Sequence, residues 1–397
     1  MQAVLHNILV VAVIFILIMS AYLFIFQGSK RVLGKYPLGM FTFTSLLFTA
    51  GLDSGLVMLP LTEFPTYQTE ADYAFSNPAA IEFGFWGFLV WTFYFLTAYY
   101  FLRIEPKIKL FEVPFFKYVN NFVTIATCAF TAYLFLGNLP TYIEGITDMQ
   151  AWLLVSFVVL TAVLTSTEIR FIKVLSVGSS WLFASLIFGM WFDSGMGVSG
   201  FLKNLGLVGD YFPNIAKFTT PINDYHEFYL MWWFSWSIMI GQFMAKFAGN
   251  MTTRALLISM LVIPSIQLAV WFAVLYGYFS SATEVAVFWK TCMVVVGVIY
   301  VVNSLDSLTR LYTDNLNWTT KRLGTPQYIV LNLVIMMGLV ALYKFQPDLM
   351  QIQYVGMVVI FLYVAAMVRM VMKREALMTP HSADKNAPLM LNQLDLN

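Results

Sequence analysis

The sequence contains few charged residues and almost no cysteine or histidine. Only 11% of the 397 residues are Asp, Glu, Lys or Arg, whereas a soluble domain carries about a quarter. The 22 basic and 21 acidic residues give a net charge of +1, which excludes the basic field that recruits nucleic acid. Cys128 and Cys292 lie in apolar segments, so neither a disulfide framework nor a Cys/His metal site is expected.

Sequence patterns of hydrolytic and metal-dependent enzymes are also missing. His6, His226 and His381 lie outside the interiors of the apolar segments. Neither the H-E-x-x-H pattern nor the G-x-S-x-G pattern occurs. We therefore expect neither an enzyme nor an organic cofactor.

Long apolar segments dominate the chain instead. Hydrophobic residues make up 60% of it and aromatic residues 17%. A bilayer core of about 30 Å needs about 20 apolar residues of helix, and the segments do not show the alternation of barrel strands. We predict an all-α membrane protein with eleven spans, centred near residues 16, 49, 91, 129, 160, 185, 238, 267, 299, 335 and 360.

The distribution of Lys and Arg between alternate connections predicts the orientation. Cytoplasmic flanks of membrane spans accumulate basic residues. One side holds eighteen of the 22 basic residues, and the other side holds Lys203, Lys217, Lys290 and Lys344. The amino terminus is therefore expected outside and the carboxyl terminus in the cytoplasm, which an odd number of spans requires. We expect a multi-pass protein of the inner (cytoplasmic) cell membrane.

A connection of about 30 residues, near 195–227, divides the spans into two sets. Five spans precede it, apart from span 1, and five follow it. Two sets of five enter the membrane from opposite sides, as in the inverted repeats of secondary transporters. The predicted units are a leading helix and cytoplasmic loop (1–37), a first five-helix repeat (38–196), an outer linker with a short surface helix (197–226), a second repeat (227–374) and a disordered cytoplasmic tail (375–397).

Span 2 contains residues that disfavour a helix at the middle of the membrane. Gly51, Asp53 and Gly55 lie close together, and Pro60 follows them. The spacing of Gly51 and Gly55 suits close packing of a neighbouring helix as well as it suits a break. Asp53 favours a break, because an ionised carboxylate at a helix centre costs about 3 kcal/mol and usually faces water, a cation or a partner.

Two groups of aromatic residues lie well inside spans 3 and 7, each on one face of its expected helix. They are Trp86, Trp91 and Tyr94 in span 3, and Trp232, Trp233 and Trp236 in span 7. Membrane Trp and Tyr commonly form interfacial belts, which suits many of the other aromatic residues. The depth of these six favours a buried cluster instead. Such a cluster attracts a cation that has no hydrogen-bond donors, by about 0.5 to 2 kcal/mol per ring, and a quaternary ammonium is such a cation.

Span 9 ends with polar residues on one helix face. Asp306 and Arg310 have the i,i+4 spacing of an ion pair, and a structural salt bridge at the cytoplasmic end is the favoured role for them. The oxygens of Asn303 and Ser304, if they face the break in span 2, are an alternative ligand set for a small hard cation.

These patterns together resemble the betaine/choline/carnitine transporter family. Residues 232–236 match its WW-x-SW core, and residues 86–94 match its W-G-x-x-x-W-x-x-Y pattern. Residues 50–55, followed by Glu63, resemble its glycine stretch A-G-M-G-x-G with a following Glu, and residues 303–307 resemble its T-S-A-D-S segment. The tryptophan pattern is specific, whereas the glycine and serine patterns are weak alone. The four occur in order and cover most of the chain.

The resemblance implies a LeuT-type inverted repeat, often assembled as a homotrimer. It implies a trimethylammonium site formed by Trp86, Trp91, Tyr94 and Trp233, with Trp236 at the cytoplasmic exit, Trp232 supporting it, and Gly51 and Asp53 beside the substrate. Where the family uses sodium, the ion is implied to lie between the backbone of Thr49 and Leu52 and the segment Tyr300, Asn303 and Ser304.

Three departures from the family pattern bear on function. The family usually has twelve spans, and eleven are predicted here. Asp53 replaces the central glycine of the stretch, which favours a net cation such as choline or provides a proton carrier. Asn303 replaces a threonine, so sodium and proton coupling both stay open.

We therefore expect a secondary transporter that takes up a betaine- or choline-like compound by alternating access, with Na⁺ or H⁺ as coupling ion. The expected partners are the small-molecule substrate, the lipid bilayer and further copies of the chain. The alternative is a non-transporting receptor, or a subunit of a larger membrane complex, built on the same scaffold.

Overall fold

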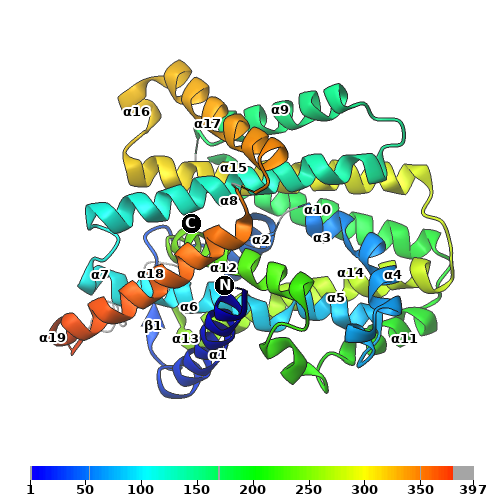
Figure 1. The fold of residues 1–397 in the computed structure, drawn as a ribbon, viewed down its shortest axis with the longest axis horizontal. Helices are drawn as coiled ribbons and strands as arrows, with labels where there is room; N and C mark the ends of the chain where they lie inside the picture. The colour runs from blue at the N-terminus through cyan, green and yellow to red at the C-terminus, as the bar shows by residue number, and fades with distance from the viewer. Residues whose placement is uncertain (1, 53, 169, 349, 379–397) are drawn as a thin grey trace.

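The computed structural model describes residues 2–52, 54–168, 170–348 and 350–378, and these residues are almost entirely helical (Figure 1). The strand pairing in this part of the chain is short: β1 (Arg31–Val32) runs antiparallel to β2 (Met251–Thr252). It joins the connection after the first helix to the connection that precedes α13 (Thr253–Leu257). Asp53 lies outside the described residues.

Nine helices or helix runs within the described ranges are long and apolar enough to cross a membrane. They are α1 (Gln2–Phe26), the run from α5 to α7 within Pro78–Ile108, α8 (Pro114–Tyr142), α9 (Asp148–Thr165), α10 (Arg170–Asp193), the run from α13 to α14 within Thr253–Ser280, α15 (Val287–Leu316), α17 (Thr325–Phe345) and α18 (Ile352–Met372). This arrangement confirms an all-α, multi-pass membrane protein.

The other two expected spans, spans 2 and 7, correspond to helices that are not among these nine. α2 (Met40–Ala50) is apolar but only 11 residues long. α12 (Asp224–Ala245) has 22 residues, and 17 of them are buried inside the protein. The count of eleven spans and the orientation of the two termini remain predictions.

The chain breaks after α2, as the sequence of span 2 predicts. Ala50 ends α2, the short α3 (Gly55–Met58) follows, and α4 (Pro60–Thr69) begins with Pro60 in its first turn. Proline suits a first helical turn because it has no N–H to leave unpaired. The backbone between α2 and α3 is therefore available to a neighbouring group.

A second break, which we did not expect, interrupts span 3. α5 (Pro78–Trp86) ends at Trp86, and α6 (Trp91–Tyr99) begins after the single turn η2 (Phe88–Val90). Gly87 adopts an extended conformation, and the Phe88 N–H donates to the Ser265 hydroxyl at 2.8 Å. The prediction that Trp86 and Trp91 share one face of a continuous helix is therefore wrong, because the helix ends between them.

Helix packing follows the same order in the two halves. The first helix of each half packs against the fifth: α2 against α10, and α12 against α18. Across the halves, α8 packs against α17 and α15 against α9, while the long helices α8 and α15 lie side by side (Figure 1). This reciprocal pairing is what two related five-helix units produce.

The remaining elements connect or extend these helices. The linker between the halves contains α11 (Val198–Gly209) and η4 (Ile215–Thr219). The run from α13 to α14 (Ile263–Ser280) also contains η5 (Ile258–Val262), and the other short elements are η1 (Ala71–Tyr73), η3 (Tyr100–Ile104), α7 (Glu105–Ile108) and α16 (Thr320–Leu323). The boundaries of the predicted units remain predictions.

The start of the carboxyl-terminal tail is ordered, contrary to the prediction of a disordered tail from residue 375. Residues Arg374–Met378 form α19, which packs against α7. The Lys107 ammonium donates to the Leu377 carbonyl oxygen at 3.1 Å, and this contact holds the short helix in place. The rest of that tail, 379–397, lies outside the described residues.

Candidate functional site

The two aromatic groups meet around Trp233 of α12. Its ring centroid lies 5.3 Å from Tyr94, 5.9 Å from Trp91 and 6.1 Å from Trp86. All four side chains are buried inside the protein. The interfacial-belt interpretation therefore does not apply to them, because a belt requires rings at the lipid headgroups.

Hydrogen bonds hold three of these rings in fixed orientations. The Trp233 indole N–H donates to the Phe85 carbonyl oxygen at 2.8 Å, and the Trp91 indole N–H donates to the Trp86 carbonyl oxygen at 2.9 Å. The Tyr94 hydroxyl donates to the Gly51 carbonyl oxygen at 2.9 Å. The break after α2 and the break after α5 thus each supply backbone oxygens that orient an aromatic side chain.

A small cavity lies among the rings. Its lining residues are Gly51, Leu52, Trp86, Tyr94, Trp232, Trp233 and Trp236. Trp91 packs behind Trp233 and Tyr94 and does not line it. The cavity measures about 10 Å³, which is the space of about one water molecule. In this conformation the rings themselves fill the site, so a trimethylammonium group fits only after they move apart.

Three indole groups that line this cavity lack partners in hydrogen-bond geometry among the described residues. The indole nitrogens of Trp86, Trp232 and Trp236 are buried and unpaired. A buried N–H without an acceptor costs about 1 to 3 kcal/mol. The site therefore combines ring faces suited to a cation with free donors suited to a carboxylate, the two ends of a zwitterion such as a betaine.

Glycines allow the close approach that forms the cavity. A Cβ at Gly51 would lie 2.6 Å from the Leu47 carbonyl oxygen and 3.2 Å from the Tyr94 ring. A Cβ at Gly241, on α12, would lie 2.1 Å from the Thr97 hydroxyl of α6. Both positions place backbone where any larger residue would push an aromatic-bearing helix away.

The structure brings the predicted cation-binding residues of α15 against the end of α2. The Ser304 hydroxyl donates to the Leu52 carbonyl oxygen at 2.6 Å and lies 3.3 Å from that of Thr49. Asn303 is fully buried, and both of its side-chain polar atoms lack partners among the described residues. Tyr300 lies one turn away, with its ring edge-on to Phe48. These oxygens have the chemistry that a small hard cation requires.

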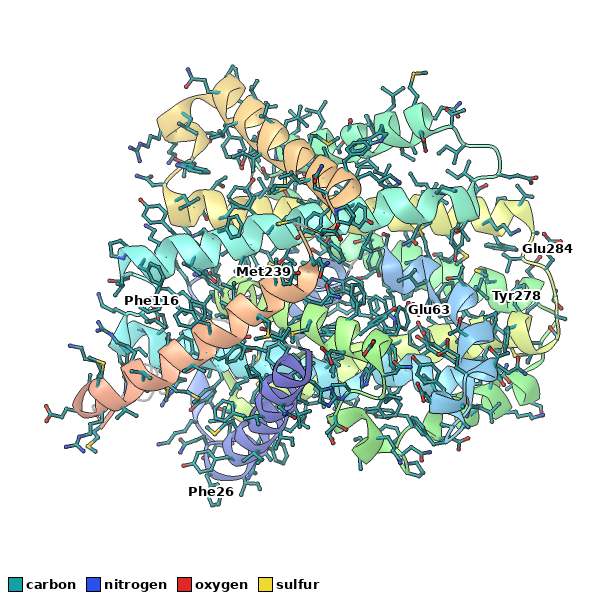
Figure 2. All side chains as sticks on the ribbon, in the orientation of Figure 1. Phe26, Glu63, Phe116, Met239, Tyr278 and Glu284 are labelled. Atoms are coloured by element: carbon teal, nitrogen blue, oxygen red, sulfur yellow. The ribbon has the colours of Figure 1, made fainter. Side chains whose placement is uncertain are left out.

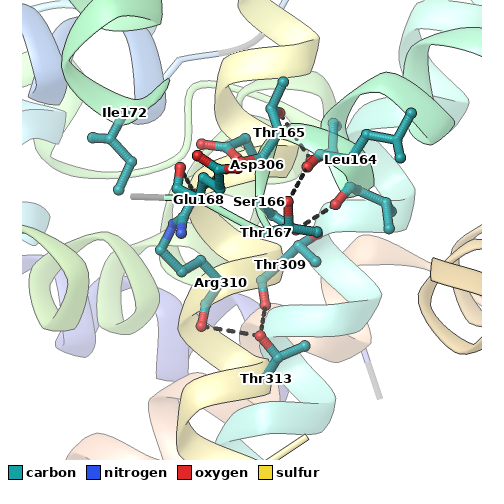
Figure 3. Close-up of polar contacts among 12 residues, drawn as sticks. Leu164, Thr165, Ser166, Thr167, Glu168, Ile172, Asp306, Thr309, Arg310 and Thr313 are labelled. Carbon is teal, nitrogen blue, oxygen red and sulfur yellow. Dashed lines mark hydrogen bonds and ion pairs between the residues drawn. The ribbon is translucent and has the colours of Figure 1, made fainter. Parts of the chain in front are cut away.

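The Asp306–Arg310 ion pair is confirmed, at 3.3 Å (Figure 3). Arg310 also donates to the carbonyl oxygens of Thr165 and Glu168, at 3.1 and 3.0 Å. Because Thr165 is the last residue of α9 and Glu168 follows it closely, the pair joins α15 to the end of the neighbouring helix. This arrangement supports the structural role that the spacing favoured.

A buried carboxyl cluster was missed at the sequence level. Glu63, labelled in Figure 2, accepts hydrogen bonds from Tyr67 at 3.1 Å, from Tyr229 at 2.6 Å, and from Tyr225. Glu82 is fully buried on α5, beside Glu63. The available signal was a charged residue inside an apolar span, which usually marks a functional group.

Sequence comparison finds transporters. The glycine betaine transporter OpuD of Bacillus subtilis is 26% identical over 287 residues, which are 60% of this chain and 55% of that protein. The ectoine/hydroxyectoine transporter of Virgibacillus pantothenticus is 23% identical over 314 residues, 67% of this chain and 61% of that protein. A glycine betaine/proline/choline/ectoine transporter of Vibrio parahaemolyticus is 30% identical over 139 residues, 33% of this chain and 24% of that protein. The chain spans about half the length of the curated relatives it matches, or less.

Structure comparison finds a solved structure of a Na⁺-coupled sialic acid symporter in a substrate-bound, outward-open state. Its superposition on this chain has a TM-score of 0.46 and a sequence identity of 13%, and it covers 95% of this chain and 84% of that chain. No family model matches the chain. The sequence relatives are transporters and not enzymes, and they confirm the resemblance that the four motifs indicate. In sequence, this chain is therefore similar to glycine betaine and ectoine transporters.

Proposed function

We propose that the protein is a secondary transporter that takes up a quaternary ammonium compound, such as glycine betaine or choline, by alternating access. The relatives named as glycine betaine and ectoine transporters support this function. The reciprocal packing of two five-helix halves supports the mechanism, because two repeats rocking around a shared midpoint expose it to one side at a time. The proposed location is the inner membrane, and the proposed assembly is a homotrimer.

The observation that carries the proposal is the convergence of rings around Trp233. Indole and phenol faces from α5, α6 and α12 meet beside the unwound backbone after α2, at positions buried from lipid. Each well-placed ring contributes about 0.5 to 2 kcal/mol to the binding of a cation. A methylated ammonium cannot form the hydrogen bonds that an ordinary ammonium forms, so ring faces are its natural ligands.

We infer that a cation gradient drives uptake. If sodium is the coupling ion, we place it between the carbonyl oxygens of Thr49 and Leu52 and the side chains of Asn303 and Ser304. Tyr300 is adjacent to this position. The distances from the Ser304 hydroxyl to the two carbonyls support this placement. Each positive charge that crosses 100 mV supplies about 2.3 kcal/mol. Asp53 remains a proposed contributor beside the substrate.

The test is uptake of radiolabelled glycine betaine and choline into proteoliposomes, with sodium and pH gradients imposed separately. Trp233→Leu should abolish saturable uptake, because the central ring of the cluster is lost. Trp181→Leu is the matched control, because Trp181 is 63% exposed on the outer surface of α10 and should leave uptake unchanged. Unchanged uptake by Trp233→Leu would show that the ring cluster is not the substrate site.

The contracted cavity favours one alternative, a receptor or complex subunit that does not transport. A site of about 10 Å³ has to open before it binds any organic cation. Binding of choline or betaine by the purified protein, without counterflow in liposomes, would support this alternative. Robust counterflow would exclude it.

A further inference from the structure

The carboxyl group of Glu82 has no donor in good hydrogen-bond geometry in the part of the chain that the structure describes, although the Tyr67 hydroxyl and the Trp86 indole lie near it. Glu82 is 0% exposed, and neither of its side-chain oxygens has a partner. Burying an ionised carboxylate without donors costs many kcal/mol. A protonated carboxyl avoids most of that cost, because it carries no charge and gains an O–H donor.

Its neighbour Glu63 has the opposite environment. Three tyrosine hydroxyls, from Tyr67, Tyr225 and Tyr229, donate to the Glu63 carboxyl group. The surroundings of the two acidic groups therefore differ: three hydroxyls donate to Glu63, whereas no described group donates to Glu82 in good hydrogen-bond geometry.

Glu82 lies near Glu63, because α4 and α5, which carry the two side chains, pack against each other. Two adjacent carboxyl groups away from water do not both ionise, and they share one proton instead. A metal ion is a poorer occupant, because the hydroxyls around Glu63 already direct their hydrogens at the oxygens that a metal would need. A Glu82 O–H donating to Glu63 satisfies both groups at once.

The carboxyl pair is connected to the aromatic cluster through Trp86. Glu82 and Trp86 are one helical turn apart on α5, and the Trp86 indole lies beside the Glu82 carboxyl. The Trp86 indole nitrogen is buried and lacks a partner in hydrogen-bond geometry. Trp86 also lines the cavity, so a substrate that moves this ring changes the surroundings of Glu82.

We propose that Glu63 and Glu82 hold one exchangeable proton, and that this proton is carried across the membrane together with the substrate. The proposal rests on the transport function proposed above. A proton from the outer solution forms the O–H bond of Glu82 in the outward-facing state. That bond breaks in the inward-facing state, when the proton passes to the inner solution and the two carboxylates are exposed to water.

Other titratable groups surround the pair. Those that face it are Tyr67 on α4, Tyr73 in η1, Tyr142 on α8, and Tyr225 and Tyr229 on α12. Burial raises the pKa of Tyr73 to about 12, so this phenol keeps its proton at neutral pH.

On the remaining elements around α5, the Tyr211 hydroxyl and the His226 Nε2 atom are buried without described partners, and the following groups contact residues outside the pair. The His226 ring stacks on Phe85, and its Nδ1 accepts the Ile222 N–H. Asp210, after α11, accepts from Asn77. On η4, Lys217 lies over the Phe75 ring, and on α14, Tyr276 contacts Phe64.

The experiment measures substrate-dependent proton movement in proteoliposomes that contain a trapped pH-sensitive dye, with sodium equal on both sides. Labelled choline and glycine betaine are the probes. In the wild type, an inward proton gradient should drive accumulation, and substrate entry should acidify the interior.

Glu82→Gln should lose both effects while retaining counterflow, because the amide preserves size and donates to Glu63 but carries no exchangeable proton. Glu227→Gln is the control. It removes a different carboxylate of α12, one that pairs with His6 of α1, and it should behave as the wild type.

Wild-type uptake that ignores the proton gradient, or a Glu82→Gln variant that still acidifies the interior, would overturn the proposal. Wild-type protein that moves neither probe would refute the transport function itself. In that case, or if Glu82→Gln does not fold, infrared difference spectra of the wild type during acid titration test the pair directly. A protonated-carboxyl band that titrates as a single proton supports the shared proton, and two independently titrating bands refute it.

Discussion

The indole nitrogen of Trp233 donates a hydrogen bond to the carbonyl oxygen of Phe85 at 2.8 Å. Because α5 ends at Trp86, the carbonyls of Phe85 and Trp86 have no helical N–H to accept from. Trp91 makes the equivalent bond to the Trp86 carbonyl oxygen at 2.9 Å. Two tryptophans of the cluster thus also cap the helix break that brings the cluster together.

The Trp233 side chain has two roles: its ring face belongs to the cluster, and its N–H donates to the Phe85 carbonyl. A smaller aromatic ring at this position separates the two. Trp233→Phe keeps a ring face but leaves the Phe85 carbonyl unpaired, so we expect a loss of about 1 to 3 kcal/mol in stability. Thermal unfolding in detergent should therefore shift down while part of the uptake is retained. Trp181→Phe, at the exposed surface, should shift neither. Equal unfolding temperatures for Trp233→Phe and the wild type would show that the indole hydrogen bond contributes nothing.

Ser304→Ala removes the hydroxyl that lies between α15 and the carbonyls of Thr49 and Leu52. If sodium binds there, half-maximal stimulation of uptake should require roughly tenfold more sodium, equivalent to about 1.4 kcal/mol of lost binding. Ser307→Ala is the matched control on the same helix, since the buried Ser307 hydroxyl has no described partner. An unchanged sodium dependence in Ser304→Ala would place the ion elsewhere.

Gly241→Ala should destabilise the contact between α6 and α12. The added Cβ would lie 2.1 Å from the Thr97 hydroxyl and 2.7 Å from the Ala98 backbone nitrogen. Overpacking of this kind typically costs about 1 to 3 kcal/mol. Gly338→Ala, on α17, meets no atom within 4 Å and should be neutral or stabilising by up to about 1 kcal/mol. Similar unfolding temperatures for the two variants would argue against the close approach of the helices.

Arg310→Met should strongly destabilise the protein, because it leaves Asp306, which is 0% exposed, as an unpaired buried charge. The expected loss is about 3 to 5 kcal/mol. Adding Asp306→Asn to the same chain removes the charge and should restore most of the stability. We would measure both variants by thermal unfolding. A double variant no more stable than Arg310→Met would show that the charge pair is not the source of the loss.

Composition and local pattern were sufficient to predict the class of the protein. The apolar segments predicted nine helix runs that the structure contains, and Gly51, Asp53 and Gly55, followed by Pro60, predicted the break after α2. The motif around Trp233 predicted the aromatic cluster. These features depend on residues near one another in the chain, where helix geometry links sequence to structure directly.

Three features could not be predicted from local sequence pattern. They are the break at Gly87, the packing of Trp91 behind Trp233, and the position of Glu82 near Glu63. Gly87 alone does not stop a helix; the Ser265 hydroxyl on α14 and the Trp91 and Trp233 indoles pair the backbone groups that the break exposes. Each of these partners comes from a residue whose distance from the break is set by the fold.

Sequence by itself determined that the chain is a bundle of membrane helices with aromatic residues deep inside two of its spans and an interrupted second span, because bilayer thickness and local helix propensity act on contiguous residues. Only the tertiary structure decided that the rings close to a cavity of about 10 Å³, and that two acidic side chains from α4 and α5 become neighbours. Contacts between helices depend on how the two halves pack together, and that packing is a property of the whole chain.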